Sequence, residues 1–362
     1  MTALDETAAW ERLRAIRSEA DAEAAGLIRG SDGGLRWRQE VSPEARILTD
    51  RYLPLCLAGP RLAFAQLGQS LDGFIATRTG DADYVTGEED RAHLHHLRAL
   101  ADAVVVGAGT AVADDPQLTV RACTGTNPVR VVLDPHGRVP PQRRVFTDGS
   151  APTLWVVTAA SGRGQHGSVG GDSGHGGLGG HGSHVGVLTL PDRDAFEPRS
   201  LLEALARRGL GRVLIEGGGV TVSRFLHQRA LDRLYVTVAP VLLGDGVPGL
   251  RFAGTSVMRD ALRPPMRRAH LGEDTLFEID LRTSQPGGPL PHEHGETGQA
   301  RREGEHSVDH GDGQPLGRAQ TGGAEGPRGD ALPGTPATDV QRQRHGEQRQ
   351  HHQGQQLGQR ST

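Results

Sequence analysis

A short apolar run that ends in glycines constrains the fold of this chain more than any other feature. Residues 104–106 are three consecutive valines, a pattern typical of a buried strand. Gly107 and Gly109 follow, and glycine lets a backbone turn tightly or approach a ligand closely. Thr110 offers a hydroxyl where a short helix can begin. Such a junction suits either an ordinary capped turn or the ligand site that α/β sheets form at strand ends, and the motifs below favour the ligand site.

The composition excludes several classes of protein. The 362 residues carry a formal net charge of -4, so we expect no nucleic-acid partner. No apolar stretch approaches the length of a membrane span, and the N-terminus lacks a signal pattern, so we expect no membrane partner and a cytoplasmic location. Cys56 and Cys123 are too few for a disulfide framework, and their spacing matches no zinc motif.

Alternating strand and helix patterns predict an α/β domain over residues 61–282. Helical spacing of apolar residues is expected over 87–101 and 198–208, and a closing hairpin over 268–282. The apolar runs that predict strands lie at 61–67, 104–106, 128–134, 153–158, 185–190, 213–215 and 231–241.

The segments outside this pattern are expected to be accessory. Residues 7–24 have the spacing of one amphipathic helix, and residues 35–60 suggest an extended connector, so residues 1–60 form an N-terminal helix and connector. Residues 161–184 are rich in glycine and histidine and predict a flexible insertion. Residues 283–362 contain no aromatic residue, Ile, Met or Cys, so we predict a disordered tail.

A second junction of strand, glycines and helix occurs late in the domain. Residues 213–216 lead into Gly217, Gly218 and Gly219, and a helix is expected to follow. Bare backbone amides and a helix N-terminus suit a pyrophosphate. The motif lacks the spacing and the early position of the Rossmann fingerprint, so we expect a dinucleotide site in a different fold.

Charged residues near these junctions are candidate ligand contacts. Arg98 and Arg121 could hold a phosphate or form salt bridges. Asp114 follows the first junction and could simply end a helix in a turn. Glu216 ends the second strand, where burying a charge without a partner is costly.

Several strings, taken together, identify a family resemblance. They lie in order at 67–73, 80–86, 97–99, 109–121 and 216–219, across most of residues 61–282. This region resembles the reductase domain of the riboflavin-pathway deaminase–reductase, whose fold is similar to that of dihydrofolate reductase. The resemblance implies a three-layer α/β/α fold with a mainly parallel central sheet.

The resemblance also implies an activity: NADPH-dependent reduction of 5-amino-6-(5-phosphoribosylamino)uracil to its ribitylamino product. Asp114 would orient the nicotinamide end of the cofactor and is the candidate catalytic residue, with proton transfer as a further hypothesis. In the implied substrate site, Arg98 and Arg121 would hold the 5′-phosphate, Glu216 would bind the pyrimidine, and Leu118 is a further position. The implied cofactor positions are Gly68, Tyr84, Thr110, Asp114, Gly218, Gly219, Val220, Thr221, Val222, Ser223 and Arg224.

Three residues depart from the family pattern. Gln66 stands where the family usually has lysine, Ala82 where it often has serine, and Tyr84 where tryptophan is common. They leave the cofactor half of the site intact, and Gln66 and Ala82 favour a second interpretation, a reductase of the same fold with a different pyrimidine, pteridine or carbonyl substrate. A third interpretation is a non-catalytic NADP-binding protein, against which the retained charged residues argue.

The resemblance leaves other features to be tested. The deaminase half needs a zinc pattern of His-x-Glu and Pro-Cys-x-x-Cys, which two isolated cysteines do not supply, so we expect a stand-alone reductase without a metal. His93 and His96 have metal-ligand spacing but no third ligand nearby. His136 and Arg138 are candidates for the cofactor 2′-phosphate, and a homodimer is expected because family members often pair.

Overall fold

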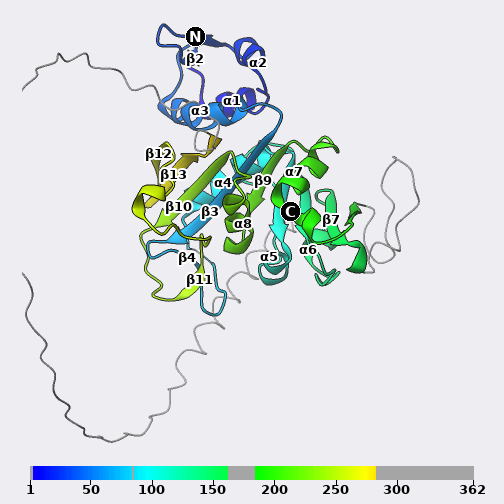
Figure 1. Cartoon of the computed structure of the whole chain (residues 1–362). Helices are drawn as coiled ribbons and strands as arrows, with labels where there is room; N and C mark the ends of the chain where they lie inside the picture. Colours follow the sequence, from blue (N-terminus) through cyan, green and yellow to red (C-terminus); the bar gives the residue numbers. More distant parts are fainter. Residues whose placement is uncertain (1–2, 84, 162–183, 283–362) are drawn as a thin grey trace, which may run out of the picture. The chain divides into compact units, whose positions relative to one another are not determined.

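The computed structural model describes residues 3–83, 85–161 and 184–282 (Figure 1). The predicted disordered tail lies outside these ranges, as do Tyr84 and all but the ends of the predicted insertion. The described residues belong to one compact unit.

A nine-stranded sheet forms the centre of this unit. From β10 to β8 every neighbouring pair is parallel, and β13 runs antiparallel to both β10 and β12. The mainly parallel sheet is therefore confirmed. Its strands, in spatial order, are β12 (Met266–Leu271), β13 (Asp274–Asp280), β10 (Arg233–Ala239), β3 (Leu62–Ser70), β9 (Arg212–Glu216), β5 (Ala103–Gly107), β6 (Val129–Leu133), β7 (Thr153–Thr158) and β8 (Val185–Leu190).

Helices cover both faces of the sheet, which gives the predicted three layers. On one face Phe64 and Leu214 pack in a core with residues of α4 (Glu88–Ala99), α5 (Ala108–Ala113) and α6 (Arg144–Thr147). On the other face Ala65 and Ile215 pack with residues of α7 (Pro198–Ala206) and α8 (Gly219–His227). Successive residues of one strand thus pack into the cores on opposite faces of the sheet, because side chains alternate across a pleated sheet.

The N-terminal segment differs from its prediction in two ways. The expected single helix over 7–24 is two helices, α1 (Glu6–Leu13) and α2 (Glu19–Ala24), because the Ser18 side chain caps a new helix at the Asp21 amide. The expected extended connector contains a strand and a helix, α3 (Pro43–Cys56), with the Ser42 side chain as its cap. Pro43 in the first turn is compatible with a helix start, whereas Pro54 obscured the helical pattern.

The remaining elements are short. The strands β1 (Leu27–Arg29) and β2 (Leu35–Trp37) form an antiparallel pair, and so do β4 (Phe74–Thr77) and β11 (Gly246–Pro248). Single 3₁₀ turns occupy Ala159–Ser161, Asp194–Phe196 and Met258–Asp260.

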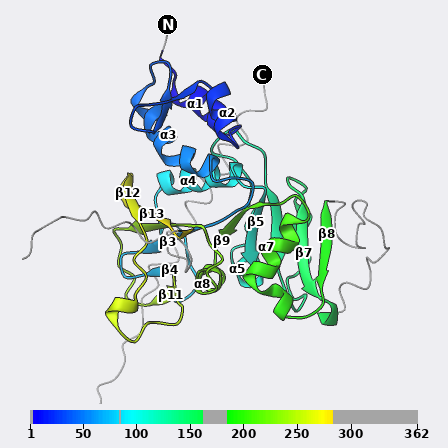
Figure 2. The ribbon, with the colours of Figure 1, turned by 45° about the horizontal axis from the view of Figure 1, so that its top comes forward.

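Buried contacts attach the N-terminal segment to the sheet through α4, which lies between the sheet and α3 (Figure 2). The Tyr52 hydroxyl on α3 is 2.7 Å from Nδ1 of His93 on α4. Arg212 on β9, only 1% exposed, donates hydrogen bonds to the Leu55, Cys56 and Gly59 carbonyls at the end of α3 and to the Leu100 carbonyl after α4. One guanidinium thus joins three parts of the chain.

Replacing Arg212 by alanine is expected to destabilise the whole unit, because the Cys56, Gly59 and Leu100 carbonyls lose this donor, whereas the Leu55 carbonyl keeps the Ala58 amide. Each buried acceptor left unpaired costs about 1–3 kcal/mol, so the free energy of unfolding should fall by roughly 3 kcal/mol or more. Urea denaturation of the full chain measures this loss. The matched control is Arg207→Ala, which removes an exposed arginine. An equal effect of the two substitutions would contradict the expectation.

Candidate active site

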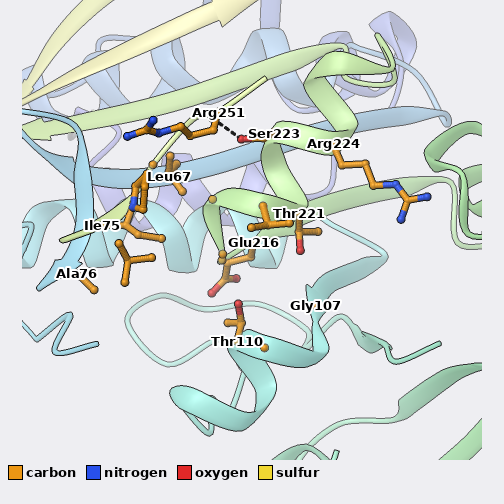
Figure 3. Close-up of a pocket in the computed structure, with 18 of the residues that line it drawn as sticks. Leu67, Ile75, Ala76, Gly107, Thr110, Glu216, Thr221, Ser223, Arg224 and Arg251 are labelled. Atoms are coloured by element: carbon orange, nitrogen blue, oxygen red, sulfur yellow. Dashed lines mark hydrogen bonds between the residues drawn. The ribbon is translucent and has the colours of Figure 1, made fainter. Parts of the chain in front are cut away.

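A cavity of about 920 Å³ lies at the carboxyl ends of β3, β5 and β9 (Figure 3). The chain runs from β3 across β5, β6, β7 and β8 and then returns to place β9 between β3 and β5. Such a reversal of strand order is where open α/β sheets bind ligands. Both glycine junctions of the sequence line this cavity, with residues 66–68 of β3 and residues 247–249 and 251–253 after α8. The volume is at the upper end of the range for small-molecule and cofactor sites.

The glycines of the second junction are required by close approach and by backbone conformation. Gly217 and Gly218 have φ of 75° and 60°, the left-handed region that favours glycine. A Cβ on Gly218 would lie 2.7 Å from Oγ1 of Thr110. A Cβ on Gly219 would lie 2.1 Å from the Gly249 carbonyl oxygen. The junction therefore brings bare backbone to the cavity wall, against the first junction and the segment after α8.

The start of α8 provides a positive environment at the same wall. Its N-cap is Gly218, no acidic residue lies in its first turn, and its free amide groups carry a partial positive charge. Arg224, His227 and Arg251 also line the cavity. Arg224 is paired with Glu197 and points away from Glu216 in Figure 3. The amide donors and the guanidinium groups of Arg224 and Arg251 fit the phosphate groups of a dinucleotide.

Arg98 and Glu216 form a buried ion pair with each other. The Arg98 guanidinium donates to both carboxylate oxygens of Glu216 through Nε and Nη2, with a distance of 2.9 Å from Nε to Oε2. Its Nη1 donates to the Thr119 carbonyl at 3.0 Å. The two residues are 6% and 8% exposed, and Glu216 lines the cavity whereas Arg98 is outside its lining. Of the two interpretations of Arg98, the structure shows the salt bridge, buried rather than at the surface.

Removing one member of this pair should cost far more than removing both. Arg98→Met leaves Glu216 as a buried charge without its cation, for which about 3–5 kcal/mol of unfolding free energy is a typical loss. In the double variant Arg98→Met/Glu216→Gln the uncompensated charge is gone, so we expect more than half of that loss to be recovered. Chemical denaturation of the four proteins of this cycle measures the coupling. Additive losses would show that the two residues act independently.

Arg121 lies beside this pair but does not line the cavity. Its side chain is exposed, and its Nη1 donates to the Thr119 hydroxyl at 2.7 Å. Its backbone amide donates to Nδ1 of His95 on α4 at 3.0 Å. Partial burial and the charges of Arg98 and Arg144 lower the pKa of Arg121. Arg121 therefore lies near the positive charges of Arg98 on α4 and Arg144 on α6, outside the main cavity.

Leu118, in the same loop, contributes no side chain to the cavity. It is 1% exposed in the core and has a φ of 56°, an uncommon left-handed conformation for leucine. A substrate would therefore meet only the backbone of Leu118.

The neutral form of His95 is strongly favoured by its surroundings. Burial, followed by the charges of Arg98 and Arg121, lowers the pKa of His95 to about 4. The unfolded chain has the ordinary value of 6.5 and binds a proton first as the pH falls. His95 therefore contributes a loss of stability that begins near pH 6.5 and continues toward pH 4.

Substitution His95→Gln is expected to reduce this acid sensitivity. The glutamine can still accept from the Arg121 amide but does not titrate, so the stability lost between about pH 7 and pH 5 should shrink by roughly 1–2 kcal/mol. Urea midpoints of both proteins at the two pH values measure the difference. His93 and His96 titrate in both proteins and cancel in the comparison. An unchanged pH dependence would contradict the assignment.

Asp114 lines the cavity where α5 ends. Burial, and then the negative charge of Asp83, raises the pKa of the Asp114 carboxyl. A carboxyl with a raised pKa at a cavity wall is a candidate for orienting a ligand or exchanging a proton. Thr110 also lines the cavity, and its side chain points toward Glu216 in Figure 3.

The remaining predicted positions fall into two groups, those that line the cavity and those that do not. Val222 is fully buried in the core beneath the cavity, because its side chain faces the sheet rather than the ligand space. His136 and Arg138 are not among the cavity-lining residues. The predicted positions that do line the cavity are Gly68, Thr110, Asp114, Glu216, Gly218, Gly219, Val220, Thr221, Ser223 and Arg224.

The cavity also includes residues that no sequence pattern indicated. Arg251 and Phe252 reach it because β11 pairs with β4 and the Arg251 amide donates to the Ser223 hydroxyl (Figure 3). The only sequence signal nearby is the turn at 244–246, which does not specify a cavity wall.

The histidine pair of α4 belongs to an aromatic cluster. His96 packs against Trp10 and Tyr52, and His93 packs against Tyr52 and Tyr235. In the described ranges no group of three or more His, Cys, Asp or Glu residues could hold a metal ion. Among the helices of the same ranges, none has the length and apolar character needed to cross a membrane.

The fold and the cavity define an α/β protein with a dinucleotide-sized site at the switch point of a mainly parallel sheet. The chain belongs to the RibD C-terminal domain family, whose model matches residues 62–263. The family resemblance expected from the sequence is thereby confirmed.

The match covers different shares of the known relatives' own lengths. The chain is 34% identical over 219 residues to the 2,5-diamino-6-ribosylamino-4(3H)-pyrimidinone 5′-phosphate reductase of Methanothermobacter thermautotrophicus, covering 59% of this chain and 94% of that protein. It is 30% identical over 236 residues to riboflavin biosynthesis protein RibD of Aquifex aeolicus, covering 65% of this chain and 62% of the relative. Acinetobacter baumannii RibD shares the fold, with a TM-score of 0.50 and 24% identity over 72% of this chain and 67% of that chain.

Proposed function

We propose that the protein is a riboflavin-pathway reductase that uses NADPH to reduce a phosphoribosylamino-pyrimidine to its ribitylamino product. The observation that carries this proposal is the glycine-walled cavity at the switch point, formed within the region that matches the RibD C-terminal domain. Residues 61–282 would be the reductase domain. The sequence resemblance points to 5-amino-6-(5-phosphoribosylamino)uracil as substrate.

A second substrate follows from a relative. The Methanothermobacter reductase, 94% of which is covered by the match, is named for the 2,5-diamino-4(3H)-pyrimidinone, which has an amino group in place of the uracil C2 oxygen. Reduction of another pyrimidine, a pteridine or a carbonyl compound, and NADP binding without catalysis, are the remaining alternatives. Assays with both phosphoribosylamino-pyrimidines decide between the two proposed substrates. Reduction of neither compound would favour the remaining alternatives.

The chain's own groups suit the cofactor and the substrate. The amides at the start of α8, with Gly218 and Gly219, would hold the diphosphate, and the bound nicotinamide supplies the hydride. Asp114, held at the cavity wall with a raised pKa, would orient the nicotinamide end. Glu216, fixed by Arg98, would accept hydrogen bonds from the pyrimidine, and Arg121 would bind the 5′-phosphate.

The cofactor assignment predicts the effect of filling the cavity. Gly109 lines the cavity, and a Cβ there would meet no atom within 4 Å, so Gly109→Leu should fold normally and occupy ligand space. The Kd for NADPH is expected to rise roughly tenfold or more, about 1.4 kcal/mol of binding free energy. Fluorescence titration with NADPH measures it. Gly254→Leu is the matched control, because Gly254 has equal room but lies outside the cavity. Unchanged affinity in both variants would place the cofactor elsewhere.

The role of Asp114 predicts a separation of turnover from binding. Asp114→Asn removes the charge and its proton exchange, so kcat should fall by about tenfold or more while the Kd for NADPH stays within about twofold. NADPH oxidation with each phosphoribosylamino-pyrimidine measures turnover. Asp115→Asn is the control, since its oxygen can still accept from the Arg144 amide at 2.7 Å. Full turnover of Asp114→Asn with normal NADPH affinity would remove Asp114 from the mechanism.

We also propose that the protein is a homodimer. Large apolar side chains are exposed from the end of β10 to the first residue of β12, among them Leu242 at 69%, Met258 at 73% and Met266 at 51%. A contiguous patch of exposed apolar groups is typical of protein interfaces, and we propose that these side chains contribute to one. Light scattering during size-exclusion chromatography of the full chain gives the mass and distinguishes a dimer from a monomer.

A further inference from the structure

The loop that contains Arg121 has no main-chain support of its own. Residues 115–128, the Arg121 loop, join α5 to β6 without a helix or a strand. In the described part of the chain, no hydrogen bond joins a backbone group of this loop to another backbone group. Asp115 and Leu118 have φ of 41° and 56°, a strained region for residues other than glycine. Contacts with the surrounding structure must therefore impose the conformation of the loop.

Two side chains of α4 hold the first half of the loop. Nη1 of Arg98 donates to the Thr119 carbonyl at 3.0 Å, and Nδ1 of His95 accepts from the Arg121 amide at 3.0 Å. The Thr119 hydroxyl accepts from Nη1 of Arg121 at 2.7 Å. The place of the Arg121 guanidinium thus follows from the place of the loop backbone.

The second half of the loop is held from the N-terminal segment. Nε1 of Trp10 on α1 donates to the Thr124 carbonyl at 2.7 Å, across 114 residues of sequence. Trp10 is 3% exposed, and its ring packs against Tyr52 and His96 with centroid distances of 5.6 Å and 4.4 Å, so the indole is a fixed donor. The two α4 residues lie within the region 62–263 that matches the family, whereas Trp10 lies before it.

We propose that Trp10 is a positioning residue for the substrate, because through the Thr124 carbonyl it holds the Arg121 loop in the conformation that binds the 5′-phosphate. Without this hydrogen bond the strained loop populates other conformations. The apparent affinity for the substrate then falls in proportion to the fraction of molecules that keep the binding conformation. The N-terminal segment is thus part of the substrate-binding machinery rather than an accessory to the fold. This inference rests on the proposed function, in which Arg121 binds the phosphate.

The test measures kcat and KM of the full chain for the phosphoribosylamino-pyrimidine that it reduces with NADPH. Trp10→Phe keeps the aromatic packing and removes the Nε1 donor, so KM should rise by about fivefold or more while kcat and the Kd for NADPH stay within about twofold. The matched control is Trp37→Phe, which should leave KM unchanged. Trp37 is also buried in the N-terminal segment, but its Nε1 donates at 2.8 Å to the Thr49 hydroxyl on α3 rather than to the loop.

Two further measurements separate positioning from a general loss of structure. Arg121→Ala should raise KM by itself, and adding Trp10→Phe should raise it no further, because the group that Trp10 positions is then absent. Amide hydrogen exchange reports the loop directly, since the Val120 and Arg121 amides are bonded to the side chains of Asn127 and His95. Exchange of both amides should be faster in Trp10→Phe than in the native protein and in Trp37→Phe.

The outcomes distinguish this inference from the proposed function. Equal KM values for Trp10→Phe and Trp37→Phe, additive effects of Trp10→Phe and Arg121→Ala, or unchanged exchange of the loop amides would each overturn the role of Trp10 while the proposed function stands. If the native protein binds NADPH but reduces neither phosphoribosylamino-pyrimidine, the proposed function is wrong and the inference is overturned with it.

Discussion

The buried ion pair between Arg98 and Glu216 is the interaction on which the rest of the site depends. It joins the end of α4 to the end of β9, across 118 residues of sequence, and its third hydrogen bond reaches the Thr119 carbonyl in the loop after α5. One guanidinium therefore fixes a helix, a central strand and a loop relative to each other. Because both charges are shielded from water, removing either residue would leave the other as an unpaired buried charge. The positions of the cavity's carboxylate and of the neighbouring cationic loop are set together.

Local sequence patterns predicted most of the sheet because each buried strand carries its own apolar run. The alternation of strands and helices, both glycine junctions and the closing hairpin could be identified without tertiary information. The N-terminal segment could not, since the break between α1 and α2 and the helix around Pro54 depend on capping and packing rather than on periodicity. The pairing of Arg98 with Glu216 was equally invisible, because a side chain's partner 118 residues away leaves no mark on local spacing.

The site shows the same division between local and distant information. Glycines near Thr110 and Thr221 could be recognised as a ligand wall because the chain needs bare backbone there. Leu118 and Val222 lie in or beside the strings that match the family, but their side chains are buried in the core. Matching of a motif cannot distinguish such a side chain from one that contacts a ligand. Arg251 enters the cavity through the pairing of β11 with β4, a tertiary event with no motif of its own.

The central position of β9 also dictates the order in which this protein can be completed. β3 and β5 are synthesised early, yet the strand that must lie between them begins at Arg212, paired with Leu62 on one side, and Ala103 pairs with Val213 on the other. Until about residue 216 has emerged from the ribosome, the sheet has an open slot with two unsatisfied strand edges. Contacts of such high sequence separation slow folding and expose edges that attract other chains. The centre of the sheet and the α3 anchor on Arg212 are consequently completed late, and β10, β13, β12 and the cavity residues 247–249 and 251–253 are added only after β9.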